Sequence, residues 1–440
     1  MTCKFSEFDG DFLRILLITY FFPPYNSVGA VRPGKLAAFL HAKGHAVHVL
    51  TAKNQPFPLG AKLELPATQV TYADGWSINA PVELLMGGRR KVAHTGFGVG
   101  LNPNSLKQRL GRLYKTLLHW PDGQIGWVGS AIKAGRHLLQ TQKFDLIYVS
   151  APSFSGCRVA RSLSAISGTP WIAEFRDLWT DNHDFQYPEW RLSIEKKWEY
   201  RLLATAGALV TVSPPLIEKL KRFKLPTWEI RNGFDPSDYV NLPDVTRIYK
   251  NGNDLNITFT GNLYPGHYDL AVFCEGLSRF LALGGKALVH IAGRNVDALL
   301  EQARKSGVAD LFICHQTVAR PVALAMQKAS DVLLTFLWDH GNQEGIYSTK
   351  LFEYAGCSRP ILAIGRPDSD VGVLLTAAAI GSACGTAETV AEKLLGWHTE
   401  KSLNGSLSTA PTIGFDFTRG AQFSKLESHL TAFVQTQSSG

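Results

Sequence analysis

Short apolar runs alternate with helical patterns along most of the chain. Residues 13–19 (LRILLIT) form an apolar run rich in isoleucine and leucine, as expected for a strand that is buried on both faces of a parallel sheet. A loop rich in proline and glycine follows, then a helical pattern that ends at Gly44 and a second strand, HAVHVLTA. This strand–helix–strand order predicts the beginning of a doubly wound α/β sheet.

The alternation continues and forms two series. The next expected strands lie at 144–152, 169–175, 208–213, 255–263, 287–294, 310–315, 331–337 and 360–365. A polar stretch over 236–255 divides them, and each series has its own first strand, which indicates two α/β domains. We therefore expect an N-terminal domain over 1–240, a C-terminal domain over 241–415 and a terminal helix over 416–440. The pattern allows this helix to return to the N-terminal domain. The polar residues 398–412 are expected to form a loop.

Length and composition agree with this picture but select no function. A chain of 440 residues is long for one core and suits two domains of roughly 200 residues each. The hydrophobic share of 45% and the charged share of 19% predict a globular protein. None of the six cysteines forms a Cys-x-x-Cys pair or a zinc-ligand cluster, which predicts reduced thiols in a cytoplasmic protein. The chain begins without a signal-peptide pattern, and no run reaches the ~18 apolar residues of a membrane span.

The net charge of +8 is concentrated in one window. Between Leu84 and Lys143 the sequence has ten lysines and arginines and a single acid, Asp122. Four leucines recur at helical spacing among these basic residues: Leu106, Leu110, Leu113 and Leu117. Such a basic amphipathic helix indicates either contact with an anionic membrane surface, on the inner face of the cell membrane, or packing of the leucines on the protein core. Nucleic acid is a poorer match because no recognition motif accompanies the charge.

Four segments carry a resemblance to a known family. They are the opening strand and loop (ILLITYFFPPYNSVGAVRPGKL), GTPWIAEFRDLWTD, VTVSPPLIEKL followed by IRNGFD, and EGIYSTKLFEYAGCSRPILAI. Together they resemble the retaining glycosyltransferases of family 4, which have the GT-B fold. The resemblance implies an α/β protein with two Rossmann-like domains facing across a cleft. It also implies transfer of a hexosyl group from a nucleotide sugar, with UDP favoured, to a hydroxyl of a glycan or lipid-linked acceptor with retention of anomeric configuration.

The last of these segments is similar to the donor-binding signature of the family. Lys350, near the expected start of a helix, is expected to neutralise the leaving phosphate. Glu353, one turn later, is expected to accept hydrogen bonds from the ribose diol. Backbone amides near the helix start are expected to cradle the diphosphate. These amides are supplied by Gly345, Ile346, Tyr347, Ser348 and Thr349.

Two positions depart from the family pattern. The signature has two glutamates with seven residues between them, and that register places Gly345 where the first glutamate belongs, with Glu344 one residue early. Either Glu344 still contacts the sugar, or the backbone of Gly345 replaces it. The loop after the first strand of the second domain also lacks the family's basic residues. Asn262 is its polar donor-binding candidate, and Arg294 is either a substitute cation or a partner in a surface salt bridge.

In the N-terminal domain, candidate residues follow the expected ends of strands, where ligands bind in open α/β sheets. Gly29 follows the first strand, and its missing side chain lets the backbone approach a donor closely. Arg32, inside the next helix, is expected to face an acceptor. The segment IAEFRDLW supplies four more candidates: Glu174 and Asp177 for catalytic contact with acceptor hydroxyls, and Arg176 and Trp179 for acceptor binding. An internal pair of Arg176 with an aspartate is the structural alternative.

The sequence contains no convincing pair of nucleophile and base. This agrees with the mechanism that the resemblance implies, in which the leaving phosphate takes the proton of the acceptor hydroxyl. We expect no metal ion and no cofactor besides the donor, because no Asp-x-Asp occurs where a Mg-diphosphate site would be expected, and Asp368-Ser369-Asp370 lies past the donor motif in a loop. Neither first strand is followed by G-x-G-x-x-G, which disfavours a dehydrogenase. Two functions stay open beside transfer: a GT-B epimerase of nucleotide sugars and a catalytically degenerate, glycan-binding GT-B protein.

Overall fold

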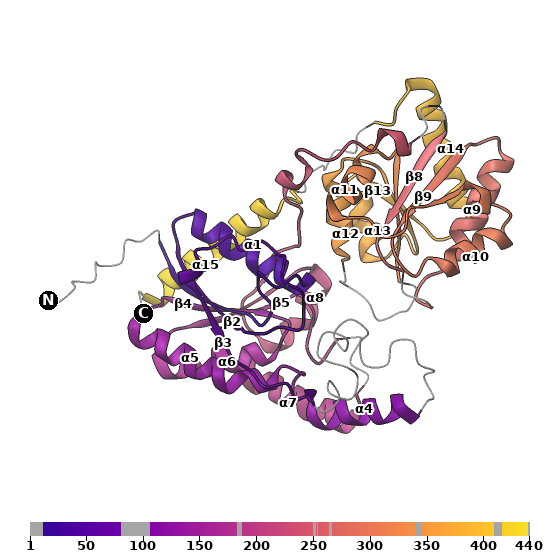
Figure 1. The fold of residues 1–440 in the computed structure, drawn as a ribbon. Coiled ribbons are helices and arrows are strands. Elements are labelled where there is room, and N and C mark those ends of the chain that lie inside the picture. Colours follow the sequence, from indigo (N-terminus) through magenta and orange to yellow (C-terminus); the bar gives the residue numbers. More distant parts are fainter. Residues whose placement is uncertain are drawn as a thin grey trace. The chain divides into compact units, whose positions relative to one another are not determined.

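The chain forms two compact units (Figure 1). The computed structural model describes residues 12–80, 106–182, 187–249, 252, 254–263, 266–338, 345, 347–408 and 416–438. The first unit comprises Met1–Ile230 and Phe423–Gly440, and the second comprises Arg231–Gln422. The second unit thus begins ahead of the expected boundary at residue 240, because Phe234 and Tyr239 pack in a hydrophobic cluster of that unit.

A seven-stranded sheet with the order β3-β2-β1-β4-β5-β6-β7 forms the centre of the first unit. Its strands are β1 (Arg14–Ile18), β2 (Ala46–Ala52), β3 (Val70–Ala73), β4 (Leu146–Ala151), β5 (Trp171–Phe175), β6 (Ala208–Thr211) and β7 (Thr227–Glu229). All neighbouring strands are parallel. β4 is buried throughout and β1 is buried after Arg14, since helices cover both faces of the sheet.

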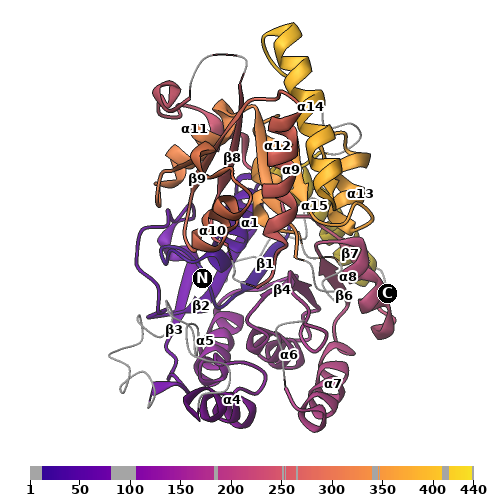
Figure 2. The same cartoon turned by 90° about the vertical axis from the view of Figure 1, so that its right-hand side faces the viewer.

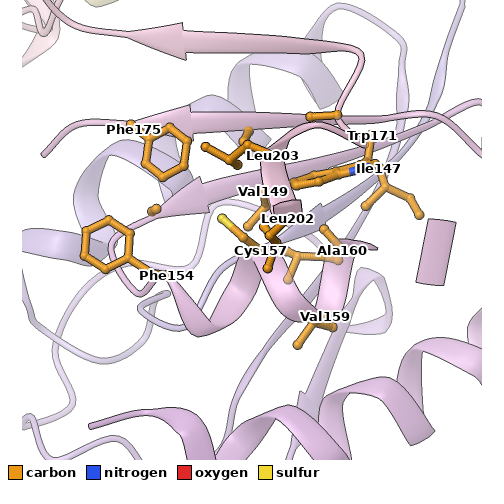
Figure 3. Packing of buried hydrophobic residues seen from close by; sticks show 14 of the residues in the cluster. Ile147, Val149, Phe154, Cys157, Val159, Ala160, Trp171, Phe175, Leu202 and Leu203 are labelled. Atoms are coloured by element: carbon orange, nitrogen blue, oxygen red, sulfur yellow. The ribbon is translucent and has the colours of Figure 1, made fainter. Parts of the chain in front are cut away.

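Helices of the first unit lie in two layers (Figures 1 and 2). They are α1 (Val28–Ala42), α4 (Leu106–Leu118), α5 (Val128–Thr141), α6 (Ser155–Ser167), α7 (Glu189–Leu203), α8 (Pro214–Leu220) and α15 (Arg419–Ser438). One hydrophobic cluster joins one face of the sheet to α5, α6 and the end of α7, and Figure 3 shows Phe154, Cys157 and Leu203 within it. A second cluster joins the opposite face to α1 and α15, so the C-terminal helix completes the core of the first unit.

The second unit repeats this architecture around a six-stranded parallel sheet with the order β10-β9-β8-β11-β12-β13. Its strands are β8 (Leu255–Thr260), β9 (Ala287–Ala292), β10 (Phe312–Cys314), β11 (Val332–Phe336), β12 (Ile361–Ile364) and β13 (Gly381–Cys384). Its helices are α9 (Leu270–Ala282), α10 (Asp297–Lys305), α11 (Arg320–Ala329), α12 (Thr349–Gly356), α13 (Asp370–Ala377) and α14 (Ala387–Asn404). One face packs on α9, α10 and α14, and the other on α12 and α13. Two Rossmann-like units are therefore confirmed.

One expected loop is wrong. Residues 398–412 look polar, but α14 continues through them as far as Asn404. The reason is tertiary: Lys401 is 7% exposed, and its ammonium donates to the Asp254 carbonyl oxygen and to the Asp331 carboxylate, both at 2.7 Å. A polar residue that is neutralised inside the unit continues the buried side of a helix as an apolar residue does.

Candidate functional site

The strand order of the second sheet marks a ligand-binding edge. β8 and β11 are neighbours, but the chain leaves β8 toward β9 on one side and β11 toward β12 on the other. In open α/β sheets ligands bind outside the carboxyl ends of the strands at this switch point. Gly261 and Asn262 follow β8 directly, and α12, which bears the expected donor motif, is the next helix after β11.

Lys350 of α12 lies across the carboxyl end of β8. Its Nζ lies 4.5 Å from the centroid of the Phe259 ring and donates to the Asn262 carbonyl oxygen at 3.5 Å. Gly261 has φ +118°, and a Cβ atom there would overlap Cε and Nζ of Lys350. The backbone conformation therefore favours glycine at this position, and any side chain there would also displace the end of Lys350.

The ammonium of Lys350 is poorly compensated. Burial lowers its pKa to about 8, and the nearby Glu353 carboxylate only partly offsets this. Lys350 forms no ion pair with any other residue that the structure describes. Because desolvation disfavours its charged form, an anionic ligand near Nζ would stabilise the ammonium. The predicted partner of a leaving phosphate thus lies in a suitable electrostatic environment.

The beginning of α12 presents backbone amides at the same edge. The Ser348 hydroxyl caps the helix and accepts a hydrogen bond from the Lys350 amide at 3.4 Å. Ser348 and Thr349 are exposed, whereas Gly345 is buried with φ +86°. The Gly345 amide donates to the Asp370 carboxylate at 2.6 Å, which ties the loop before α12 to the first residue of α13.

The remaining residues of the donor motif divide into described and undescribed ones. Tyr347 is half-buried, and its ring lies edge-to-face to Phe352 at 6.3 Å. Glu344 and Ile346 lie outside the described residues. Whether Glu344 or the Gly345 backbone contacts the sugar therefore stays a prediction.

Glu353 is held by residues that the sequence did not indicate. Arg320, the first residue of α11, donates to the Glu353 carboxylate and to Asp238, each at 3.0 Å. The Tyr239 hydroxyl donates to the Glu353 carbonyl oxygen at 2.7 Å. Arg320 contacts one carboxylate oxygen of Glu353, Oε1. No periodicity links these positions, so only the fold brings them together.

Arg294 and Asn262 lie on the two loops that flank this edge. Arg294 follows β9, is exposed and forms no ion pair with a described residue, so the salt bridge considered from the sequence is not found within that part of the chain. The Leu263 amide donates to the Arg294 carbonyl oxygen at 3.1 Å, and the Asn295 side chain donates to the Leu263 carbonyl oxygen at 3.2 Å. These bonds join the loop of Arg294 to the loop of Asn262.

In the first unit, Arg32 and Glu174 bind each other rather than solvent. Arg32 Nε donates to Glu174 Oε1 at 2.9 Å, and the two residues are 2% and 0% exposed. Ser150 donates to the other carboxylate oxygen at 2.6 Å, and Arg32 donates to the Ile230 carbonyl oxygen at 2.9 Å. Burial by itself raises the pKa of Glu174. The Arg32 guanidinium and the hydrogen bond from Ser150 lower it by more, so the pKa of Glu174 lies below its ordinary value. Arg32 and Glu174 thus form a buried ion pair with each other, and their contact with an acceptor stays a prediction.

Trp179 and Arg176 are also directed inward. Trp179 is 1% exposed and stacks on Phe154 with ring centroids 5.7 Å apart, which leaves no ring face for an acceptor. Arg176 Nε donates to the Ala151 carbonyl oxygen at 3.0 Å, and burial lowers the pKa of its guanidinium. Asp177 is exposed, and Gly29 lies in the first turn of α1 against the Phe21 ring. Of the candidates in this unit, these two positions stay accessible at the surface.

Asp122, the single acid of the basic window, holds the turn between β4 and α6. Its carboxylate accepts from the Ser153 hydroxyl at 2.8 Å, the Ser155 amide at 3.0 Å and the Ser155 hydroxyl at 2.6 Å. The carboxylate thus caps the positive end of α6. The isolation of Asp122 among ten basic residues was the only sequence signal for this role.

The family comparison covers most of the first unit and the beginning of the second. Residues 34–238 match the family model described as Glycosyltransferase Family 4. No curated protein sequence matches the chain significantly. These findings, with the two Rossmann-like units, support a glycosyltransferase of the GT-B type.

Solved structures share the fold at low sequence identity. A glycosyltransferase from Rickettsia africae aligns with a TM-score of 0.56 and 12% identity, over 96% of this chain and 99% of that one. HepE from Anabaena, in complex with UDP, aligns with a TM-score of 0.55 and 13% identity, over 97% and 98%. Sucrose-phosphate synthase from Thermosynechococcus elongatus aligns with a TM-score of 0.53 and 14% identity, also over 97% and 98%. Of the helices that the structure describes, none combines the length and the hydropathy that a bilayer span requires.

Proposed function

We propose that this protein transfers a hexosyl group from a nucleotide sugar to a hydroxyl of a glycan or lipid-linked acceptor, with retention of anomeric configuration and without a metal ion. The observation that carries the proposal is the position of Lys350. Its poorly compensated ammonium lies at the switch point of the second sheet, next to Gly261 and the beginning of α12. A diphosphate is the chemical group that this combination of cation and helix amides binds best.

The donor is assigned to the second unit. In the proposed complex, the amides of Ser348 and Thr349 at the beginning of α12 hold the diphosphate, since the Gly345 amide already donates to Asp370. Lys350 neutralises the diphosphate, and Asn262 and Arg294 line the adjoining loops. Glu353, oriented by Arg320, accepts hydrogen bonds from the ribose. UDP is the favoured nucleotide because the similar HepE structures contain UDP and UDP-glucose.

The transfer step needs no protein nucleophile. The bond between the anomeric carbon and the diphosphate oxygen breaks, and a bond from the same carbon to the acceptor oxygen forms on the same face. The acceptor proton passes to the leaving phosphate, which departs as the nucleoside diphosphate. Lys350 stabilises the negative charge that develops on the leaving oxygen. In the first unit, Asp177 and Gly29 are the proposed surface contacts, and the Arg32–Glu174 pair positions the end of β5.

The test is an assay of the whole chain with candidate nucleotide sugars and glycan acceptors. A thermal-shift panel of UDP, GDP, ADP and dTDP identifies the base first, and stabilisation by UDP is expected. Product analysis by NMR should then show an anomeric configuration equal to that of the donor, and EDTA should leave the rate unchanged. An inverted product or a rate abolished by EDTA contradicts the corresponding part of the proposal. An isomerised donor identifies an epimerase, and an unchanged donor with bound glycan identifies a binding protein.

The cytoplasmic location and the peripheral membrane association expected from the sequence remain predictions. The basic segment over 84–143 motivated them, and part of that segment, residues 84–105, lies outside the described residues. The described part contains α4, which has exposed leucines on its surface.

A further inference from the structure

Three described leucines on one face of α4 do not pack on the core. Leu110, Leu113 and Leu117 recur on one face of the helix and are between 53% and 57% exposed. Packing on the core was one of the two alternatives that the sequence left open. The structure instead shows these three side chains exposed. The side chain of Leu106, the fourth leucine of the stripe, lies outside the described residues.

A second exposed apolar stripe lies on α7. Trp190, Ile194 and Trp198 follow each other at intervals of four residues and are between 41% and 52% exposed. Trp120, two residues after α4, lies against this stripe, with its ring centroid 6.3 Å from that of Trp190 and 5.5 Å from that of Trp198. Trp120 therefore connects the two stripes, and both views show α4 and α7 at the same end of the first unit (Figures 1 and 2).

A buried arginine fixes the two helices to each other. Arg191 of α7 is 0% exposed and donates to the Lys115 carbonyl oxygen at 2.6 Å and to the His119 carbonyl oxygen. These carbonyl groups belong to the end of α4 and the residue after it, where the helix dipole favours a cation. Glu195 pairs with Arg191 at 2.7 Å. The relative position of the stripes is thus built into the fold of the first unit.

Most of the exposed charges on these two helices are basic, and Glu189 at the beginning of α7 is an exposed acid. On α7 the glutamates Glu195 and Glu199 are buried in ion pairs with Arg191 and Arg222, so they do not contribute negative charge to the surface. Lys197 and Arg201 are exposed on the same helical face as the tryptophans. On α4, Arg109 and Arg112 are exposed, and the helix contains no acid.

We propose that this surface, the α4–α7 face, docks on a bilayer that contains anionic lipids. It consists of Leu110, Leu113, Leu117, Trp120, Trp190, Ile194 and Trp198. Leucine and tryptophan side chains enter the boundary between headgroups and acyl chains, and the basic residues contact lipid phosphates. A second copy of this chain fits less well, because it would place one basic surface against another. The identification of the acceptor as lipid-linked rests on the proposed function, but docking itself does not.

The experiment is vesicle co-sedimentation of the full chain at low salt. Vesicles of phosphatidylcholine with phosphatidylglycerol should bind the protein, and vesicles of phosphatidylcholine alone should bind it at least roughly tenfold more weakly. The apolar stripes are tested by Leu113→Glu with Leu117→Glu, and by Trp190→Ala with Trp198→Ala. The charge is tested by Arg109→Glu with Arg112→Glu. Each pair should weaken binding by roughly tenfold or more. The matched controls are Leu403→Glu and Arg304→Glu, exposed residues of the second unit, and they should bind as the original chain does.

Thermal unfolding and light scattering separate docking from misfolding and from self-association. A variant pair that lowers vesicle binding should keep its unfolding temperature and its molecular mass. Equal binding to both vesicle types, undiminished binding of all three variant pairs, or a dimer that these variants dissociate would each overturn the proposal. Binding is measured without donor, and transfer to a soluble acceptor is measured without vesicles, so failure of docking and failure of the proposed activity are distinguishable.

Discussion

Helices α6 and α12 begin at equivalent places in the two sheets, but their first turns differ. Each follows the strand that lies beside the first strand of its sheet, β4 in the first unit and β11 in the second. The first turn of α6 is occupied by an internal anion, the carboxylate of Asp122. The first turn of α12 is capped by the neutral hydroxyl of Ser348.

The charged side chains at the two switch points differ in the same way. Arg32 in the first unit is neutralised by Glu174, whereas Lys350 in the second forms no ion pair with a described residue. A charge that the protein itself neutralises stabilises the fold, and a cation left poorly compensated is available to a ligand. The same topology thus provides a structural edge in one unit and a candidate donor site in the other.

The largest effect should come from breaking the buried pair of the first unit. Glu174→Gln leaves Arg32 buried without its counter-ion and should lower the free energy of unfolding by about 3–5 kcal/mol. Urea unfolding followed by tryptophan fluorescence reports this, because eight of the ten tryptophans belong to the first unit. Glu64→Gln removes the half-exposed partner of Lys35 and should change stability by less than about 1 kcal/mol. If Glu174→Gln kept full stability but lost activity, Glu174 would instead be a ligand contact.

Removing the poorly compensated cation of the second unit should lower activity and leave stability unchanged. Lys350→Ala should lower kcat by about 10²–10³-fold, because the leaving phosphate loses its stabilising charge, while the unfolding curve stays unchanged. Steady-state kinetics with saturating donor measure the effect. Lys305→Ala, an exposed lysine of the same unit, is the matched control. Full turnover of Lys350→Ala would remove the basis of the proposed function.

A substitution of Asp122 tests whether the first turn of α6 is occupied by the protein's own carboxylate. Asp122→Asn keeps the shape but weakens the three hydrogen bonds from Ser153 and Ser155, and we expect a loss of about 1–3 kcal/mol of stability without a direct effect on donor affinity. Hydrogen exchange of the α6 amides together with donor titration measures both. The control is Asp74→Asn, whose carboxylate is exposed. A selective loss of donor affinity with normal α6 protection would instead connect this turn with the ligand.

Glu353 and Arg320 test the ribose contact. Glu353→Gln should raise KM for the donor roughly tenfold with little change in kcat, since a charged acceptor of the ribose hydroxyls is lost. Arg320→Ala should raise KM by a smaller factor, because it releases Glu353 without removing it. The comparison needs initial rates over a donor series. A fall in kcat at unchanged KM would place Glu353 at the reacting bond.

The pH dependence gives the smallest and most specific effect. Since the pKa of Lys350 is about 8, its ammonium is present below pH 8 and is lost as the pH rises. The value of kcat/KM should therefore decrease by up to about tenfold per pH unit above pH 8. Lys350→Arg should abolish this decrease, because arginine keeps its charge. A basic limb that persists in Lys350→Arg would belong to another group.

Much of the fold was predictable because it depends on local patterns. The apolar runs at 13–19 and 255–263 correspond to β1 and β8, and Gly261 lies directly after β8, where a ligand-binding turn was expected. The helix start near Ser348 was also predicted, since a serine before an apolar helix is a local capping signal. The proposed role of Lys350 came from the resemblance of this segment to the family's donor motif, and it stays a prediction.

The sequence did not indicate the partners that are distant along the chain. Glu174 was expected to contact an acceptor, yet its partner Arg32 lies 142 residues away in the chain. Arg320 and Asp238 around Glu353 carried no local signal, and the helix through Lys401 depends on Asp254 and Asp331. A single sequence shows which side chains are charged but not which charges meet.

The sequence by itself determined the alternation of strands and helices, the two-unit architecture and the position of the donor motif. These follow from hydrophobic periodicity, capping and backbone preferences, which act over a few residues. Only the tertiary structure decided which polar residues were neutralised inside a unit, and which apolar stripes, such as that of α7, remained exposed. The physical reason is that burial and charge compensation depend on the distances between segments, and the folded sheet sets those distances.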